Sequence, residues 1–370
     1  MARASKVRIL HTADIHLRKE GDARWHALEH IIQLCEDRKV DALVITGDLF
    51  DHNFDAHSLK PAITELFSDR PFRIILLPGN HDANAYGSGA YYGSSVVVMT
   101  EPGQTETVRD VNLIGFPYIK KLRDDSVADV LEQLRDSVEN GKTNMLLYHG
   151  ELLDLFDSSF FSRLDFGNEG ARRYMPARLS WFATLGVDHV LAGHFHSRFT
   201  ILQKSKTIFV YSGSPVSITK RETGVRHVGW IEAGKRPEAL AVSTYHYTPK
   251  NVTLNPFDEV DPVEKVLEVV GKPKPGEEPL IRIDGLVDFY GLGMNETKFK
   301  KSIMVALEEH FGKKIQIEFM VQDISGLLQD DIFRRFHEKL FRLGKNKMLA
   351  ESELLEMLRL GAQAMIEAKL

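Results

Sequence analysis

Two patterns of apolar residues, short continuous runs and helically spaced positions, follow one another in turn over the first 250 residues. Short, nearly continuous apolar runs predict buried strands at residues 7–11, 42–46, 72–77, 113–116, 144–148, 189–192 and 208–211. Between them, residues 25–38 and 126–138 show helical spacing. In the first of these helices, Leu28, Ile31 and Cys35 recur at i, i+3 and i+7. This alternation predicts an α/β domain with substantially buried sheets.

The pattern changes after about residue 225. Two longer alternating runs, 225–232 and 239–247, predict antiparallel strands, and the composition shifts near Pro249. Beyond that point the sequence predicts a helix, a linker, a strand, a helix and a strand at residues 262–270, 271–279, 280–287, 296–310 and 314–321. The tail from Leu327 predicts two helices joined around Gly344.

Three parts follow from this division of the chain. We expect a catalytic domain over residues 1–250, a small α/β capping module over residues 251–325 and a C-terminal helical segment over residues 326–370.

Composition limits the kind of protein that the chain can be. Of 370 residues, 43% are hydrophobic and 27% charged, which is ordinary for a globular protein. No apolar run reaches the ~18 residues that a membrane span needs, and the segment 7–11 is too short for a signal-peptide core, so we expect a cytoplasmic protein. The single Cys35 excludes an internal disulfide and a cysteine-based zinc site. Many nucleic-acid binders have a net positive charge, whereas this chain has a net charge of −5. A local basic groove would therefore have to attract DNA.

Residues that carry chemistry gather in five short blocks, four of them just after a predicted strand. The blocks are His11-Thr-Ala-Asp14-Ile-His16, Gly47-Asp48-Leu-Phe-Asp51, Gly79-Asn80-His81-Asp82, Tyr148-His149-Gly150 and Gly193-His194-Phe-His196. Each block alone is a common loop or turn pattern. Functional groups of open α/β sheets collect at the carboxyl ends of strands, so all five in this order indicate one site.

The residue types suit the hydrolysis of a phosphodiester. That reaction needs an activated water and charge neutralisation on the phosphoryl oxygens, and two metal ions roughly 3.5–4 Å apart supply both. A carboxylate can bridge two ions, while imidazole and oxygen ligands fill the other positions. In an extended chain, residues i and i+2 point the same way, so Asp14 and His16 can serve one site, as can His194 and His196.

The order of the blocks resembles the calcineurin-like metallophosphoesterase superfamily over residues 7–215. The resemblance implies a two-layered β-sandwich flanked by helices. It also implies two divalent ions: we expect Mn first, with Fe, Zn or Mg as alternatives. Carried over by position, one ion would be held by Asp14, His16, Asp48 and His196. The second would be held by Asp48, Asn80, His149 and His194, with Asp48 as the bridge. His81 would stay off the metals and act as a catalytic residue near the leaving group.

Particular sequence segments indicate which branch of the superfamily the chain resembles. Ser/Thr protein phosphatases carry an Arg soon after Gly-Asp, and residues 47–53 contain none. Residues 10–17, 46–51 and 211–215 are similar to segments of SbcD and related double-strand-break repair nucleases, and the small module lies where those nucleases carry a DNA-capping domain. The resemblance therefore implies a two-metal-dependent nuclease that hydrolyses DNA phosphodiester bonds as an exonuclease, an endonuclease or both.

Two alternatives stay open at this point. One is a small-nucleotide phosphodiesterase of the same superfamily, against which the long extension after Lys250 counts. The other, of a different class, is a catalytically silent scaffold with the same fold, against which the complete set of ligand types counts.

Contacts with DNA and with partners are predicted from weaker signals. Arg198, Arg172 and Arg173 are candidates for DNA contacts, with solvated loop residues as the alternative.

At the C-terminus, one apolar stripe comprises Ile332, Phe333, Phe336, Leu340 and Leu343. Either the stripe packs on the chain's own core, or, as the resemblance implies, it docks onto the coiled-coil base of an SbcC-type, SMC-like ATPase, with Phe336 in the contact. A homodimer is left open.

Overall fold

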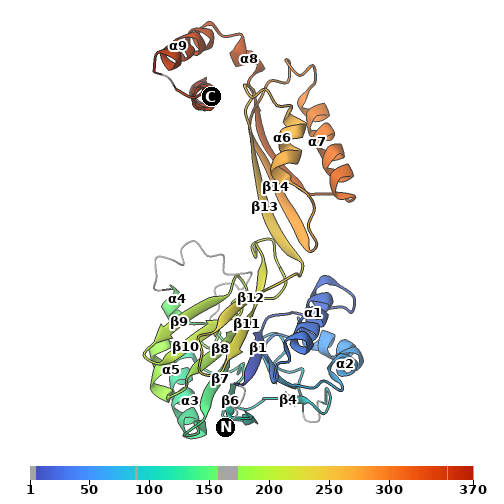
Figure 1. Cartoon of the computed structure of the whole chain (residues 1–370), viewed down its shortest axis with the longest axis vertical. Helices are drawn as coiled ribbons and strands as arrows, with labels where there is room; N and C mark the ends of the chain where they lie inside the picture. The colour runs from blue at the N-terminus through green and yellow to red at the C-terminus, as the bar shows by residue number, and fades with distance from the viewer. Residues whose placement is uncertain (1–5, 88–90, 157–173, 348, 370) are drawn as a thin grey trace. The chain divides into compact units, whose positions relative to one another are not determined.

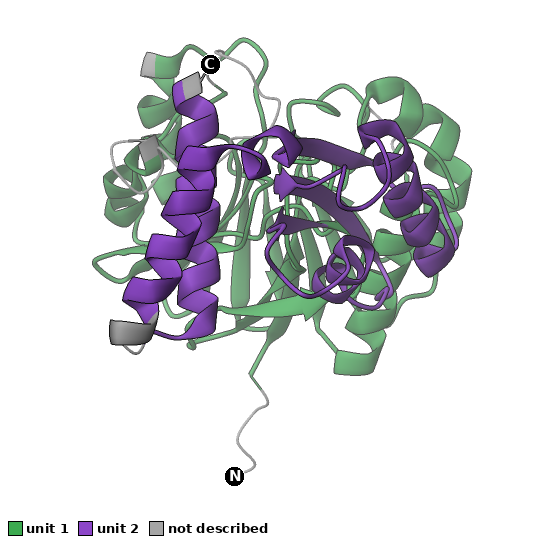
Figure 2. Cartoon of the chain, turned by 90° about the horizontal axis from the view of Figure 1, so that it is seen from above, with its two compact units in different colours: residues 1–247 green, residues 248–370 purple. Residues whose placement is uncertain are grey.

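The computed structural model describes residues 6–87, 91–156, 174–347 and 349–369. The internal contacts of the chain divide it into two compact units, residues 1–247 and 248–370 (Figures 1 and 2). Among the described residues, none of the helices has both the length and the apolar character needed to cross a membrane.

Two six-stranded sheets form the first unit (Figure 1). The first sheet has the order β12 (Glu238–Val242), β11 (Arg226–Glu232), β1 (Arg8–Thr12), β2 (Ala42–Thr46), β3 (Arg73–Leu77) and β4 (Val96–Val98). The second has the order β5 (Thr105–Val108), β6 (Val111–Phe116), β7 (Thr143–His149), β8 (His189–Gly193), β10 (Thr207–Tyr211) and β9 (Thr200–Lys204). Strands β1 to β4 are parallel, and so are β6, β7, β8 and β10, so the carboxyl ends within each group lie along one edge.

The helices of this unit pack on the outer faces of the two sheets. They are α1 (Ala23–Arg38), α2 (Asn53–Phe67), α3 (Val127–Gln133), α4 (Leu153–Phe156) and α5 (Leu179–Leu185), with the 3₁₀ helices η1 (Asp124–Ser126) and η2 (Leu134–Ser137) on either side of α3. Helix α1 begins where the Asp22 side chain accepts hydrogen bonds from the backbone N–H groups of Arg24 and Trp25. It ends at Lys39, which is in the left-handed conformation.

Successive residues of each central strand point to two different cores. On β2, Ala42 and Val44 join the core between the sheets, whereas Leu43 and Ile45 join the core under α1 and α2. Strand β7 repeats this division between the inter-sheet core and the core under α3 and α5. The result is a helix–sheet–sheet–helix sandwich, so the predicted two-layered β-sandwich flanked by helices is confirmed (Figure 1).

Two predictions in this unit were wrong in detail. The helix expected over 126–138 is α-helical only at α3, with 3₁₀ turns around it. The strand expected over 239–247 is broken, because β12 ends at Val242 and β13 begins at His246. Between them, the Thr244 hydroxyl donates to the carbonyl of Pro215 and the Tyr245 carbonyl accepts from Ser217 N–H, so these groups leave the strand ladder.

The second unit is an α/β module followed by a helical hairpin. Its sheet has the order β13 (His246–Leu254), β14 (Glu277–Val287) and β15 (Ile317–Asp323). Its helices are α6 (Pro262–Val270), α7 (Glu296–Phe311), α8 (Ser325–Leu328), α9 (Asp331–Lys347) and α10 (Glu351–Lys369). Helix α6 has the bounds expected from the sequence, because Asp261 caps its first turn and Pro262 fits the first helical position.

The sequence misplaced boundaries of β14, β15 and α9 in the second unit; β15, for example, begins at Ile317, three residues after the expected start. Strand β14 already begins at Glu277, inside the expected linker. Helix α9 continues through Gly344, where a helix break was expected. A Cβ atom at Gly344 would lie 2.3 Å from Leu354 Cδ2, so this glycine allows α9 and α10 to approach closely and does not end the helix.

Candidate metal centre

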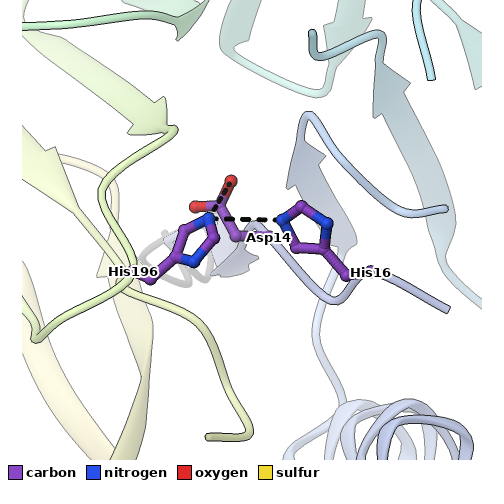
Figure 3. Close-up of side chains that lie close together, drawn as sticks. All are labelled: Asp14, His16 and His196. Carbon is purple, nitrogen blue, oxygen red and sulfur yellow. Dashed lines mark hydrogen bonds and ion pairs between the residues drawn. The ribbon is translucent and has the colours of Figure 1, made fainter. Parts of the chain in front are cut away.

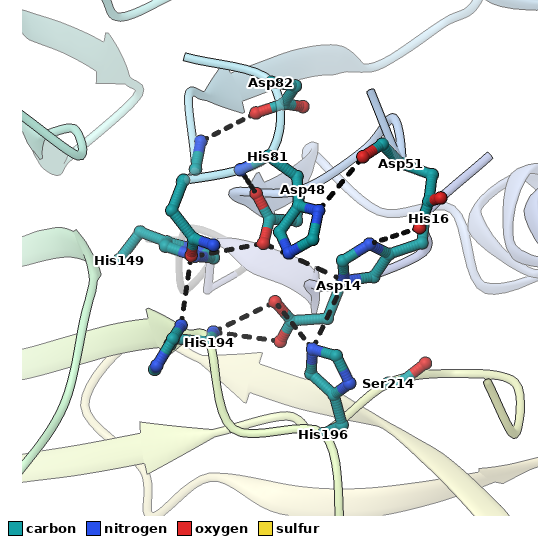
Figure 4. A network of polar contacts seen from close by, with 12 residues as sticks. Asp14, His16, Asp48, Asp51, His81, Asp82, His149, His194, His196 and Ser214 are labelled. Carbon is teal, nitrogen blue, oxygen red and sulfur yellow. Dashed lines mark hydrogen bonds and ion pairs between the residues drawn. The ribbon is translucent and has the colours of Figure 1, made fainter. Parts of the chain in front are cut away.

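The five sequence blocks meet where the two sheets bring their strand ends together (Figure 4). Asp14 and His16 follow β1, Asp48 follows β2, and Asn80 follows β3. From the second sheet, His149 ends β7, while His194 and His196 follow β8. All seven predicted metal ligands and His81 are therefore in one place, although they are up to about 180 residues apart in the chain.

Glycines in the blocks allow this close approach. A Cβ atom at Gly47 would lie 1.8 Å from Nδ1 of His149, and one at Gly193 would lie 2.0 Å from the Thr46 carbonyl oxygen. Four of the predicted ligands themselves have a positive φ that L side chains rarely adopt: 55° at Asp14, 54° at His16, 51° at Asp48 and 97° at His194. Such strain occurs at functional sites where the surrounding structure enforces it.

One group of ligand atoms comes from Asp14, His16 and His196 (Figure 3). Nε2 of His16 lies 3.2 Å from Nε2 of His196, and Nε2 of His196 lies 3.9 Å from Oδ1 of Asp14. One ligand atom from each residue falls within 4.8 Å of the others, and all three side chains are buried. Two imidazole nitrogens and a carboxylate thus face a common point.

A second group surrounds Asn80 and His149. Oδ1 of Asn80 lies 2.9 Å from Nε2 of His149 and 3.1 Å from Nδ1 of His194. Asp48 lies between this group and the first, because its Oδ2 is 3.3 Å from Nε2 of His149 and 3.8 Å from Nε2 of His16. The arrangement places one carboxylate where it faces both groups.

The donor set fits divalent metal ions. Oδ2 of Asp48 is buried and makes no hydrogen bond within the described residues, which is costly for a carboxylate oxygen unless a cation faces it, either a protonated His149, whose Nε2 lies 3.3 Å away, or a metal ion. Imidazole nitrogens with carboxylate and amide oxygens are ligands that Mn, Fe and Zn accept. The residues that share this centre therefore match the chemistry of a metal site.

Outer contacts fix the orientation of three imidazole rings. Nδ1 of His16 lies 3.1 Å from Oδ1 of Asp51, and Nδ1 of His196 lies 3.4 Å from Oε1 of Glu222. Nδ1 of His149 lies 2.9 Å from the carbonyl oxygen of Thr46, to which it donates. Each contact uses Nδ1 and leaves Nε2 facing the centre, as carboxylates and carbonyls do behind metal-binding histidines. Sequence reasoning gave no role to Asp51, although it lies in a block, and no motif marked Glu222.

His81 lies on the rim of the centre and is only partly buried. Its backbone N–H donates to Oδ1 of Asp48 at 2.8 Å, and its Nδ1 lies 3.0 Å from the carbonyl oxygen of Asp51. One His81 nitrogen also lies within 4.8 Å of ligand atoms of His16 and Asp48. The neighbouring Asp82 is buried and accepts from Gly79 N–H and the Tyr86 hydroxyl, so it holds the loop and does not face the centre.

Burial and charge act in opposite directions on the central residues. Burial lowers the pKa of His149, but the Asp48 carboxylate outweighs it and raises that pKa to about 10. Burial likewise opposes ionisation of Asp48, while His149 and His16 hold its pKa below the ordinary value. In the metal-free protein a proton on His149 therefore balances Asp48, and a metal ion binding here would displace that proton.

A cavity of about 460 Å³ opens onto this centre. His16, His81 and His196 line it, together with Arg18 and Arg24, which sequence reasoning missed. The two arginines had a sequence signal, since they follow the first block closely.

Of the three predicted DNA-contact residues, only Arg198 lies within the described residues. Arg198 is exposed, and it is not among the residues that line the cavity. Arg172 and Arg173 lie outside the described residues.

Comparison with known proteins agrees with this geometry. A family model described as calcineurin-like phosphoesterase matches residues 7–198, more than half of the chain. The chain belongs to the calcineurin-like phosphoesterase family. The resemblance seen in the five sequence blocks is therefore confirmed, and calcineurin-like phosphoesterases are metal-dependent, as the ligand-rich centre indicates.

Curated relatives of the chain carry the names of nucleases and DNA repair proteins. The chain is 26% identical over 250 residues to a subunit of the nuclease SbcCD from Staphylococcus epidermidis, covering 58% of this chain and 64% of that protein. It is 24% identical over 237 residues to "DNA double-strand break repair protein Mre11" of Sulfurisphaera tokodaii, covering 59% of this chain and 56% of that protein. The matches thus span less than two thirds of these relatives. Among solved structures, TT1561 of Thermus thermophilus aligns with a TM-score of 0.40 and 13% identity over 64% of this chain and 99% of that one.

Proposed function

We propose that the chain is a two-metal-dependent nuclease that hydrolyses DNA phosphodiester bonds. The observation that carries the proposal is the convergence of seven ligand-type side chains in one centre, among them Asp48, whose buried Oδ2 has no hydrogen bond within the described part of the chain. Membership of the phosphoesterase family supports the reaction class. The choice of DNA is supported by the relatives named as an SbcCD nuclease subunit and an Mre11 repair protein.

The proposed ligands divide into two sets that share Asp48. Asp14, His16 and His196 would complete one set, and Asn80, His149 and His194 the other. Bound there, Mn²⁺ ions, or Fe, Zn or Mg as alternatives, would supply an activated water and neutralise phosphoryl charge. The chain's own contribution is to fix the ligands: Asp51, Glu222 and the Thr46 carbonyl hold the imidazole rings in place.

His81 is the proposed proton donor to the departing oxygen. The Asp51 carbonyl accepts from its Nδ1 and so fixes the ring, while the backbone N–H of His81 holds Asp48. The other ring nitrogen can then carry a proton toward the cavity, which His81 lines.

One assay separates the candidate functions. With Mn, the wild-type chain should cleave linear duplex and single-stranded DNA as well as a chromogenic phosphodiester. Cleavage of small diesters and cyclic nucleotides without cleavage of DNA would instead support the small-nucleotide phosphodiesterase. Full metal loading with no hydrolysis of any of these substrates would support the silent scaffold.

The module over residues 251–325 is proposed to help hold duplex DNA. Its sheet and the helices α6 and α7 share a core of their own. A chain that ends after Lys250 should then keep its activity on a small chromogenic diester and lose cleavage of duplex DNA. Equal loss on both substrates would show that the module only supports folding.

The C-terminal stripe serves largely as the chain's own core. Phe333 is buried, and Phe336 and Leu340 pack in the same cluster as Leu358 of α10. A Cβ atom at Gly361 would lie 2.4 Å from Cζ of Phe336, so this ring lies directly on α10. Replacing Phe336 with Glu would disrupt the hairpin, and this residue is therefore unsuited to test docking.

Other apolar residues of the hairpin are exposed. They are Ile332 (69% exposed) and Leu343 (46%) on α9, and Met357 (43%) and Leu360 (51%) on α10. Gly344 meets Leu354 while Phe336 meets Gly361, so the two helices are antiparallel. On each helix, the exposed residues lie on the same rotational side of the residues that contact the other helix. Because the two helices are antiparallel, both sets of exposed residues then lie on one face of the hairpin.

This face is the proposed docking surface for an SbcC-type, SMC-like ATPase. The relative named as a subunit of SbcCD supports an assembly of that kind. Ile332→Glu combined with Leu360→Glu should abolish binding to the ATPase of the source organism and leave hydrolysis of a small diester intact. Val305→Glu on α7, where Val305 is 43% exposed, is the matched control. Binding that survives the double substitution would refute the assignment of this face.

A further inference from the structure

Asp51 organises one wall of the cavity beside the metal centre. Its Oδ1 lies 3.1 Å from Nδ1 of His16 and 3.4 Å from Nη1 of Arg24, while its Oδ2 accepts from Nε of Arg18 at 2.6 Å. The carboxylate is almost fully buried, with 4% of the residue exposed. A candidate metal ligand and a guanidinium group are thus attached to opposite oxygens of one fixed carboxylate.

Arg18 uses only part of its hydrogen-bonding capacity. Its Nε is bound to Asp51, but neither of its Nη nitrogens has a hydrogen-bond partner among the described residues, and its side chain is 57% exposed where it lines the cavity. Arg24 differs, because its side chain is 13% exposed and its Nη1 donates to the carbonyl of His16 and to Asp51. Arg18 is therefore the guanidinium that is held in place and still presents free donors to the cavity.

The position of Arg18 relative to His16 determines which group it can reach. His16 directs Nε2 toward His196 and Asp48, at 3.2 and 3.8 Å, and directs Nδ1 toward Asp51. The two nitrogens lie on different sides of the ring, so Asp51 and the Nε of Arg18 bound to it lie on the Nδ1 side of His16, away from the nitrogen that faces His196 and Asp48. Arg18 and His16 line the same cavity, so a strand with one phosphate at the centre would bring a neighbouring phosphate toward Arg18.

We propose that Arg18 binds the phosphate next to the scissile one along the substrate strand. The proposal rests on the proposed nuclease function and adds a specificity-determining residue to it. A guanidinium group whose Nε is anchored offers two parallel N–H donors, which match two phosphate oxygens. Tyr174 and Ile218 also line the cavity and give the intervening nucleotide an apolar surface. The site therefore favours polynucleotides over diesters that contain a single phosphate.

The first test measures binding without catalysis. Metal-free protein in EDTA is titrated with a fluorescein-labelled single-stranded oligonucleotide, and anisotropy gives the affinity at several salt concentrations. Arg18→Gln should weaken binding roughly 10-fold, the worth of one hydrogen bond to a charged group. It should also make the slope of log affinity against log salt shallower by about 0.7, the share of one phosphate contact on a single strand.

Arg109→Gln is the matched control. Arg109 is 55% exposed and pairs with Asp41 at 2.8 Å, so it resembles Arg18 in exposure and pairing. Asp41 directly precedes β2, at the end of the sheet opposite the centre. This variant should bind the oligonucleotide as wild type does. An unchanged affinity and salt slope for Arg18→Gln would overturn the proposal.

The second test uses cleavage with Mn. For Arg18→Gln, KM on a trinucleotide should rise roughly 10-fold, and both kcat and KM on a chromogenic diester with one phosphate should stay unchanged. Equal impairment on both substrates, or loss of bound Mn, would show that Arg18 only supports Asp51 and would also overturn the proposal. If the wild-type chain cleaves no DNA, the nuclease function fails, while the metal-free binding measurement still decides the role of Arg18.

Discussion

The buried His11 should make the stability of the metal-free protein depend on pH. Its Nε2 lies 2.8 Å from Oγ1 of Thr46, and its Nδ1 is buried without a hydrogen-bond partner in the described chain. A protonated ring would carry an N–H at that position with no acceptor, and burial lowers the pKa of His11 from 6.5 to about 3. The folded protein therefore binds a proton at His11 only well below the pH at which the unfolded chain does.

The sign and size of this pH dependence follow from the linkage between proton binding and folding. Above pH 6.5 His11 is neutral in both states, so its contribution to stability is fully present there. As the pH falls from 6.5 toward 3, only the unfolded state gains the proton, and the free energy of unfolding decreases by about 1.4 kcal/mol per pH unit. Between pH 7.5 and pH 5 this amounts to about 2 kcal/mol.

The assay is urea unfolding of the metal-free chain and of His11→Gln at both pH values. Glutamine keeps an amide that can bond Thr46 but has no titration in this range. The wild-type protein should lose about 2 kcal/mol more than the variant on acidification. If both proteins lose the same free energy, the buried neutral state of His11 is not what the structure implies, and the reasoning fails.

Two further substitutions test the geometry of the centre. Gly47→Ala should destabilise the chain by about 1–3 kcal/mol and weaken Mn binding, because the new Cβ would overlap His149. Gly21→Ala is the control and should keep full Mn affinity, since Gly21 has a similar φ and open space around it. Equal Mn binding by both variants would contradict the steric argument. His81→Ala should lower kcat by ~10²–10⁴ while bound Mn is unchanged, and a substrate with a good leaving group should suffer less; loss of Mn from this variant would make His81 a ligand.

The sequence predicted the central strands and the strand-end blocks because their signals are local, but it did not predict β4, β5 and β9. A buried parallel strand is a continuous apolar run, as at β2, and ligand residues follow directly where such a strand ends. No prediction covered α2, a helix that continues through Pro61, although a proline is a helix-breaking signal in sequence. The centre itself could be predicted as a set of residues, but its distances depend on how two sheets meet.

The residues that were missed act through contacts between distant segments. Glu222 supports His196 from a loop 26 residues away, and Asp51 connects His16 with Arg18 across 35 and 33 residues. Asp51 and Arg18 lie in or next to a sequence block, but nothing in the local sequence shows which distant residue each one contacts, and no motif marks Glu222. Gly344 shows the opposite error, because a glycine that is a break signal in sequence serves helix packing in the fold.

The Mn content of wild-type protein and of Asp48→Asn, measured together with cleavage of end-labelled duplex DNA, tests the central claim most directly. Asp48 faces both ligand groups through one buried oxygen, so a single substitution should affect both ions. We predict two Mn per wild-type chain with DNA cleavage, and fewer than two Mn with no detectable cleavage for Asp48→Asn. An Asp48→Asn protein that keeps two Mn and most of its cleavage rate would contradict the shared, two-metal centre.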